Sequence, residues 1–309
     1  MEAITRLRCK MQYKNFETGE FTDTGERTAE EALEIIRQFP WEQQREHLVI
    51  SLTNPSVTIE GTDKDFLKLA LYYNDKFVLH YCNAAGELWT KAFVRLADSF
   101  PLIGSFFEKQ PFNTDGFRKE YTLFQNNKQH FISQDFHYEA NFRRCCRYLL
   151  QTSAINLSFG LCILLWRLWA FFWGNGMSPA LWIIVCCFVL FWGGGLNLLL
   201  FAGYYRHVRG KLLIMSQGND IFYYGFKNSL KEYRKSDIMR LVYRREAFAS
   251  RSPTAFFAYV KLEMKDASEI YMPNLLLSDE ALLRKLAGIP QITLNRIPWL
   301  FKRDYFPKS

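Results

Sequence analysis

The stretch from residue 257 to residue 272 decides how the carboxy-terminal part of the chain folds. It reads Phe257-Ala-Tyr-Val-Lys-Leu-Glu-Met264, then Lys265-Asp-Ala-Ser268, then Glu269-Ile-Tyr-Met272. Apolar and polar residues alternate in the two outer segments, and a short polar interruption separates them. Alternation with period two is typical of a half-buried strand, and such an interruption is typical of a turn. The stretch therefore predicts an antiparallel β-hairpin.

The surrounding sequence supplies more strands and one closing helix. Residues 211–215 and 221–224 flank another polar turn, and residues 236–243 form a further strand-like segment. Residues 278–286 begin with a serine that can cap a helix and continue with helical apolar spacing. We expect residues 206–290 to form a β-barrel closed by a helix.

Two uncharged stretches near the middle of the chain predict a transmembrane hairpin. No Asp, Glu, Lys or Arg occurs between residues 148 and 166 or between residues 178 and 205. A helix needs about 20 apolar residues to cross a bilayer. We expect spanning helices at about 148–173 and 179–204, within a membrane segment of residues 141–205.

Basic residues at both ends of this segment predict its orientation, because cytoplasmic flanks are enriched in Lys and Arg. The rule places both termini in the cytoplasm. The net positive charge continues beyond the segment, since residues 206–309 carry 19 Lys and Arg against 10 Asp and Glu. These residues either meet anionic lipid headgroups or only set the topology. The candidates are Arg143, Arg144, Arg147, Arg206, Arg209, Lys211, Arg234, Lys235, Arg240, Arg244 and Arg245.

The carboxy-terminal half resembles bacterial membrane proteins that carry a two-helix hairpin and a PH-like domain. Three segments carry the resemblance: Lys235-Ser-Asp-Ile238 before a strand, Tyr271-Met-Pro273 closing a hairpin, and Leu277-Ser-Asp-Glu-Ala-Leu-Leu283 in the final helix. The resemblance covers roughly residues 140–290. It implies a PH-like barrel that serves in binding or assembly, a place in the bacterial inner membrane, and no catalytic residues.

Residues 1–140 predict a separate α+β domain. Thr28 followed by Glu31 is the pattern of a helix capping box. Strand-like alternation follows in several short segments joined by polar turns, and residues 92–108 have helical apolar spacing. We expect two helices and four or five strands. The segments at 55–60 and 66–69 resemble small α+β immunity domains that neutralise toxins by binding.

Asn156 and Asn197 are the polar residues of interest inside the two predicted spans. Each lies seven or eight residues from the cytoplasmic end of its helix, so the two amides fall at the same depth. We expect an interhelical hydrogen bond worth about 0.6–2 kcal/mol. This packing role is preferred over an ion path.

The chain lacks the compact motifs of catalysis. It contains no HExxH, GxSxG, GxGxxG or phosphate-binding GKS/GKT sequence, and its seven cysteines include no CxxC pair. We therefore expect no catalytic residue, no cofactor and no metal, and a protein that is not an enzyme.

These observations predict a membrane-anchored, non-catalytic binding or scaffold protein that presents two cytoplasmic domains. The alternative is a membrane-anchored immunity or defence component that binds a cognate protein. Expected partners are the lipid bilayer with its anionic headgroups, an unidentified protein, and a second copy of the chain. Nucleic acid is not expected, because no stacking motif accompanies the charge. The basic, aromatic tail at 291–309 either meets headgroups or packs on a domain.

Overall fold

The chain divides into two compact units in the computed structural model. The first unit contains Met1–Asp135 and Ser216–Asn219, and the second contains Phe136–Met215 and Asp220–Ser309. The residues that the structure describes are 5–45, 51–108, 112–120, 127–143, 145–150, 158, 161–162, 165–166, 169, 196–245 and 256–295.

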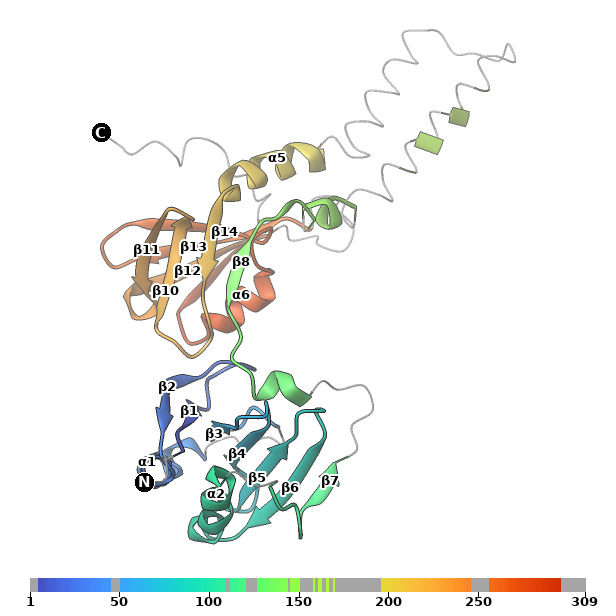
Figure 1. Cartoon of the computed structure of the whole chain (residues 1–309). Helices are drawn as coiled ribbons and strands as arrows, with labels where there is room; N and C mark the ends of the chain where they lie inside the picture. Colours follow the sequence, from blue (N-terminus) through green and yellow to red (C-terminus); the bar gives the residue numbers. More distant parts are fainter. Residues whose placement is uncertain are drawn as a thin grey trace. The chain divides into compact units, whose positions relative to one another are not determined.

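The first unit is built on a seven-stranded antiparallel sheet with the order β2-β1-β3-β4-β5-β6-β7 (Figure 1). The strands are β1 Leu7–Gln12, β2 Thr22–Arg27, β3 Ser56–Glu60, β4 Phe66–Leu71, β5 Phe77–Cys82, β6 Leu88–Phe93 and β7 Arg118–Glu120. Strands β3 to β6 pair consecutively and form an antiparallel meander, in agreement with the predicted short strands joined by polar turns. The sheet is larger than the four or five strands expected, because β1 and β2 join one side of the meander and β7 joins the other.

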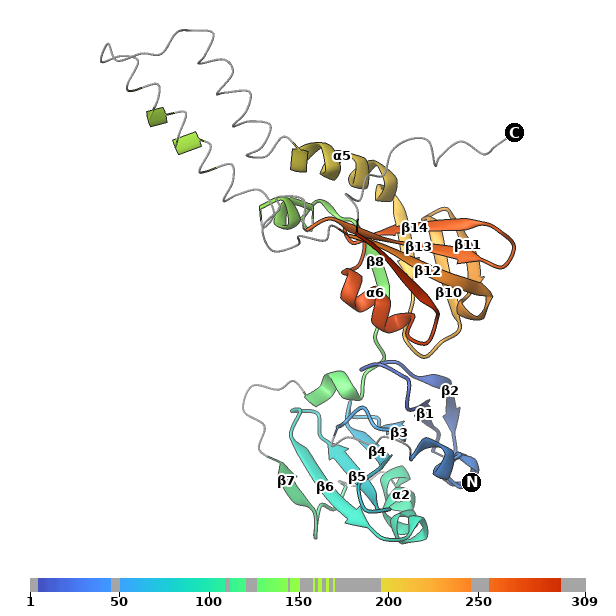
Figure 2. The ribbon, with the colours of Figure 1, turned by 180° about the vertical axis from the view of Figure 1, so that it is seen from behind.

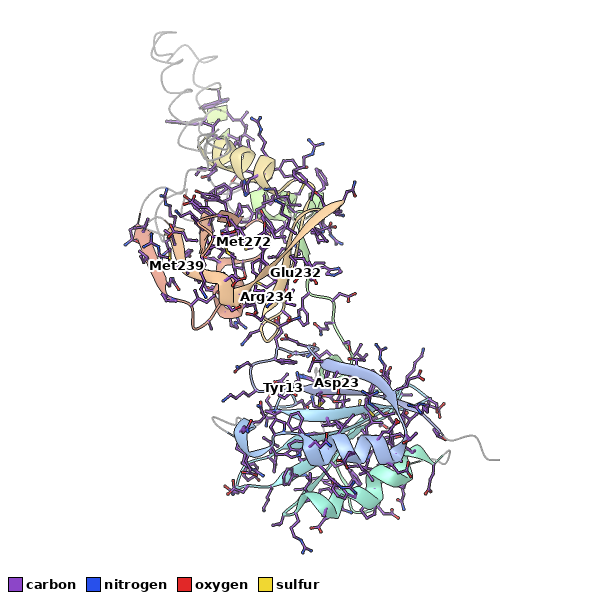
Figure 3. The ribbon with its side chains drawn as sticks, turned by 90° about the vertical axis from the view of Figure 1, so that its left-hand side faces the viewer. Tyr13, Asp23, Glu232, Arg234, Met239 and Met272 are labelled. Atoms are coloured by element: carbon purple, nitrogen blue, oxygen red, sulfur yellow. The ribbon has the colours of Figure 1, made fainter. Side chains whose placement is uncertain are left out.

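Two helices, α1 Ala29–Gln38 and α2 Phe100–Phe107, cover one face of this sheet (Figure 3). Strand β4 contributes Leu67 and Leu69 to the apolar core beneath them. The second helix is shorter than the predicted segment 92–108. Strand β6 continues to Phe93, a 3₁₀ turn follows at Leu96–Ser99, and a proline stands in the first turn of α2. Proline suits that position because its missing N–H would have no helical partner there.

The start of α1 confirms the predicted capping box. Thr28 Oγ1 accepts a hydrogen bond from the Glu31 backbone N–H at 3.3 Å, and the Glu31 carboxylate accepts one from the Thr28 N–H at 2.9 Å. These two bonds satisfy amide donors that a helix leaves without intrahelical partners. The same bond to Thr28 is the main reason that the pKa of Glu31 lies below its ordinary value.

Removal of this cap should loosen α1 locally. We expect Thr28→Ala to lower the stability of the helix start by about 1 kcal/mol, which corresponds to roughly fivefold faster amide exchange over residues 29–38. Hydrogen exchange with mass spectrometry on the full chain measures this locally. Thr28→Ser keeps the hydroxyl acceptor and is the matched control. Equal protection in Thr28→Ala and the unmodified chain would contradict the role of the cap.

The second unit contains two open four-stranded sheets, ordered β11-β10-β9-β8 and β14-β13-β12-β15 (Figure 2). The strands are β8 His137–Glu139, β9 Lys211–Ile214, β10 Ile221–Phe226, β11 Ser229–Arg234, β12 Ile238–Arg245, β13 Ala258–Met264, β14 Glu269–Pro273 and β15 Gln291–Asn295. The predicted hairpin of β13 and β14 is confirmed, with Val260 opposite Met272. Strand β15 occupies the first five residues of the predicted tail and pairs in parallel with β12. The rest of the tail lies outside the described residues.

Two helices complete the core of the second unit. Helix α5, Leu196–Val208, contributes Tyr204 and Val208, and helix α6, Asp279–Lys285, contributes Leu282. Ser278 caps α6, as expected, by accepting a hydrogen bond from Ala281 N–H at 3.4 Å. In the sequence this helix lies between strands β14 and β15, and in the structure it packs on the core.

Two expectations about the architecture are wrong. The described chain is mainly β-sheet with few helices, and the predicted closed barrel is instead a pair of open sheets on one shared core. Among the described residues no helix combines the length and apolar character needed to cross a membrane. That finding contradicts the predicted α+β membrane fold and the predicted integral placement in an inner membrane. Most of the two stretches at 148–173 and 179–204 lies outside the described residues.

Candidate functional site

A polar pocket in the second unit brings together residues from three segments. It has a volume of about 720 Å³. Its lining residues are Asn141, Arg143, Arg147, Tyr148, Asn274, Ser278 and Asp279. The first four come from the segment that follows β8, Asn274 follows β14, and the last two form the start of α6. Ligand pockets commonly have volumes of about 300–1,000 Å³, so this one can hold a small polar group.

Arg143 and Arg147 supply the positive charge of this pocket. They lie four residues apart in a short helical segment, so their side chains share one face. Both are exposed, and neither has an ion-pair or hydrogen-bond partner within the described part of the chain. Two unpaired guanidinium groups that share a face can bind one phosphate or carboxylate with several charge-assisted hydrogen bonds.

Tyr148 fixes this helical segment to the body of the unit. Its hydroxyl donates to the backbone carbonyl of Phe256 and also lies 3.2 Å from Asn274 Oδ1, while its ring packs edge-on against Phe257 at 5.5 Å. Burial raises the pKa of Tyr148 well above its ordinary value, so the hydroxyl stays protonated as a donor. Asn274 in turn donates to the same Phe256 carbonyl at 2.6 Å. The arginines therefore stand on an anchored segment, which reduces the entropy lost on binding.

Asp279 is the acidic group in the pocket. Its carboxylate accepts a hydrogen bond from the Tyr243 hydroxyl. Burial and this carboxylate raise the pKa of Tyr243, so Tyr243 remains a proton donor to Asp279. Among the described lining residues, two guanidinium groups stand against one carboxylate, and this net positive charge favours an anionic ligand.

One family model matches this part of the chain, namely a PH domain over residues 137–285. Residues 137–285 form a PH-like domain. The match begins at β8 and ends in α6, so it covers the first open sheet, strands β12, β13 and β14 of the second, and the pocket. The predicted PH-like domain is thus confirmed. The resemblances to two-helix membrane proteins and to toxin-immunity domains have no support from this comparison.

Comparison with whole proteins adds no named relative. No curated protein and no solved structure matches the chain.

The remaining basic candidates do not form one site with Arg143 and Arg147. On β12 of the PH-like domain, Arg240 pairs with Glu263, whereas Arg244 and Arg245 lie 5.7 Å from the rings of Tyr259 and Tyr243 respectively. Lys211, at the start of β9, is half-buried over the rings of Tyr224 and Phe226, and burial lowers its pKa.

The other predicted basic residues lie at separate exposed places. Arg234 ends β11 and is labelled in Figure 3, and Lys235 follows it in a 3₁₀ turn. Arg206 and Arg209 are exposed on and just after α5. Arg144 lies outside the described residues. The sequence predicted basic residues as binding candidates, but only the fold shows that two of these arginines lie at the pocket and the others do not.

Only one of the two asparagines in the predicted pair lies among the described residues. Asn197 is fully buried in the first turn of α5. Asn156 lies outside the described residues. A hydrogen bond between the two amides therefore stays a prediction.

A second cluster, in the first unit, was not anticipated from the sequence. Lys10, Thr58, Lys68 and His80 stand opposite one another on β1, β3, β4 and β5, so they form a polar row across the sheet. All four are buried, on the face opposite the helices. The alternation that places Leu67 and Leu69 toward the helices also directs Lys68 to the other face, but it gives no sign that this face is covered.

Lys68 is the central member of this row. Its Nζ donates to Gln12 Oε1 at 2.8 Å, to the Leu52 carbonyl at 2.5 Å and to the His130 carbonyl at 3.2 Å. Three acceptors match the three N–H donors of a protonated amine. Burial and the nearby charge of Lys10 nevertheless lower the pKa of Lys68 to about 7. The side chain is 0 % exposed, so a substrate cannot reach this amine in the folded state.

Lys68 makes the stability of the first unit depend on pH. Its amine loses a proton near pH 7 in the folded state but only near pH 10.5 when unfolded. Between these values the unfolded chain binds more protons, so folding becomes more favourable as pH rises. We expect the free energy of unfolding of the unmodified chain to rise by about 1–2 kcal/mol relative to that of Lys68→Met from pH 7 to pH 8.5. Urea unfolding of the full chain measures it.

The exposed Lys64 provides the control for this prediction. The difference between the unmodified chain and Lys64→Met should stay constant over the same pH range. A constant difference for Lys68→Met as well would show that the buried amine has an ordinary pKa.

The described part of the chain offers no metal centre. No group of three or more His, Cys, Asp or Glu side chains is arranged to hold a metal ion among these residues. Two thiols of the first unit are buried, and burial raises the pKa of Cys9 to about 12 and that of Cys82 to about 11. A thiol that stays protonated at neutral pH is a poor nucleophile.

Proposed function

We propose that this chain is a non-catalytic binding protein whose PH-like domain holds an anionic lipid headgroup. The observation that carries the proposal is a pair of guanidinium groups, Arg143 and Arg147, that share one face of a helical segment at the pocket and have no partner among the described residues. A phosphate can accept hydrogen bonds from both groups. The asparagine and serine side chains of the pocket supply neutral donors for the rest of a headgroup.

The non-catalytic part of the proposal draws on the state of the reactive groups. The amine of Lys68, whose pKa is lowered to about 7, is enclosed by protein. Cys9 and Cys82 are held in the protonated form by burial. The exposed arginines of the pocket offer hydrogen-bond donors and no acceptor, which suits the binding of an anion.

The pair of arginines should control binding to anionic vesicles. We expect the double variant Arg143→Gln/Arg147→Gln to bind vesicles of phosphatidylcholine and phosphatidylglycerol at least tenfold more weakly than the unmodified chain, since a hydrogen bond to a charged group is worth about 1.5–3 kcal/mol. Co-sedimentation of the full chain with these vesicles, over a series of salt concentrations, measures the change. Vesicles of phosphatidylcholine alone give the uncharged reference.

A matched variant separates a specific pocket from diffuse charge. Arg206→Gln/Arg209→Gln removes the same charge from an exposed pair on and beside α5 and should leave binding within about twofold of the original. An equal loss in both double variants would show that net charge, not the pocket, drives association. Calorimetry with sn-glycerol 1-phosphate then shows whether the phosphate group is recognised apart from the vesicle surface.

A further inference from the structure

The first unit contains a second pocket of opposite character, with a volume of about 650 Å³. It lies at one end of the sheet, beside the turn from β3 to β4 and the end of α2. All of its lining residues belong to the first unit. Its aromatic walls are Tyr81, Phe106 and Phe112, and its acidic residues are Asp63, Asp65 and Glu108.

The three rings form a continuous wall. Tyr81 comes from β5, Phe106 from α2, and Phe112 from the segment before β7. Ring centroids are 4.7 Å apart for Tyr81 and Phe112, 5.6 Å for Phe106 and Phe112, and 6.3 Å for Tyr81 and Phe106. The faces of aromatic rings carry partial negative charge and attract cations.

None of the three carboxylates, Asp63, Asp65 and Glu108, forms an ion pair with another described residue. Among the described residues, no Lys, Arg or His lines the pocket. Asp65 is half-buried, and burial, followed by the charge of Asp63, raises its pKa. The Tyr81 hydroxyl lies 3.4 Å from Asp65 Oδ2. Carboxylates that have no ion-pair partner among the described residues, set beside aromatic rings, form an environment that a cation would stabilise.

Gly61 makes the close approach of these groups possible. A Cβ atom built on Gly61 would stand 2.1 Å from Asp65 Oδ1 and 3.0 Å from Phe106 Cζ. The backbone N–H of Gly61 donates to the Asp65 carbonyl at 2.9 Å and closes the turn. Any side chain at residue 61 would thus displace either the carboxylate or the ring.

We propose that this pocket binds an organic ammonium group, either of a small amine or of a lysine side chain on a partner protein. Aromatic walls suit an alkylammonium ion, whose methylene groups pack on the rings while its charge meets Asp65 and Asp63. A bare metal ion is a poorer fit, because no described group of three or more ligating side chains surrounds one point. This site is distinct from the anion pocket of the PH-like domain and carries the opposite charge.

Calorimetry on the full chain tests the proposal with two probes of the same charge. The probes are n-butylammonium, for a free amine, and Nα-acetyl-lysine methylamide, for a lysine within a peptide. Saturable binding of either probe is expected, and the neutral analogues n-butanol and Nα-acetyl-norleucine methylamide should not bind. The stronger of the two ammonium probes identifies the source. No binding of either ammonium probe, or equal binding of the neutral analogues, would overturn the proposal.

Variants connect the binding to the pocket. Asp65→Asn keeps the size of the side chain and removes its charge, and Phe112→Leu removes one ring. Each should weaken binding at least tenfold. Asp115→Asn, at an exposed position outside the pocket lining, should leave binding unchanged. Circular dichroism establishes that each variant is folded, and unchanged affinity in folded Asp65→Asn would refute the assignment.

Discussion

Burial of strand β4 on both faces is the constraint on which the first unit depends. Every residue from Phe66 to Leu71 is buried. On one face its leucines pack beneath α1 and α2, and on the other Lys68 needs oxygen acceptors, because an unsatisfied buried amine is costly. Residues from β1, from the chain before β3 and from the segment after β7 meet that need. One amine thereby ties three remote parts of the sequence to the centre of the sheet.

The same strand also positions the acidic pocket. Asp65 directly precedes β4, so the register of β4 between β3 and β5 places its carboxylate beside Tyr81. Gly61 then lets the carboxylate and the ring of Phe106 approach one another. The pocket is a consequence of strand pairing, and its acidic residues would have no common location without it.

In the PH-like domain, a single tyrosine fixes the segment that carries the pocket arginines. Tyr148 joins the helical segment that carries Arg143 and Arg147 to the loop before β13 and to the residue after β14. The two units therefore carry pockets of opposite charge: exposed guanidinium groups line one, and carboxylates beside aromatic rings line the other. In each pocket the charged residues come from more than one segment of the sequence.

Local chemistry in the sequence determined where several elements begin and turn. Thr28 with Glu31 specifies the start of α1, Ser278 the start of α6, and the polar residues at 265–268 the hairpin of β13 and β14, because each acts on neighbours a few residues away. Long-range packing decided the rest. Whether the polar face of β4 meets water and whether the sheets of the PH-like domain close depend on partners distant in the chain. For that reason Lys68 is buried and the sheets stay open.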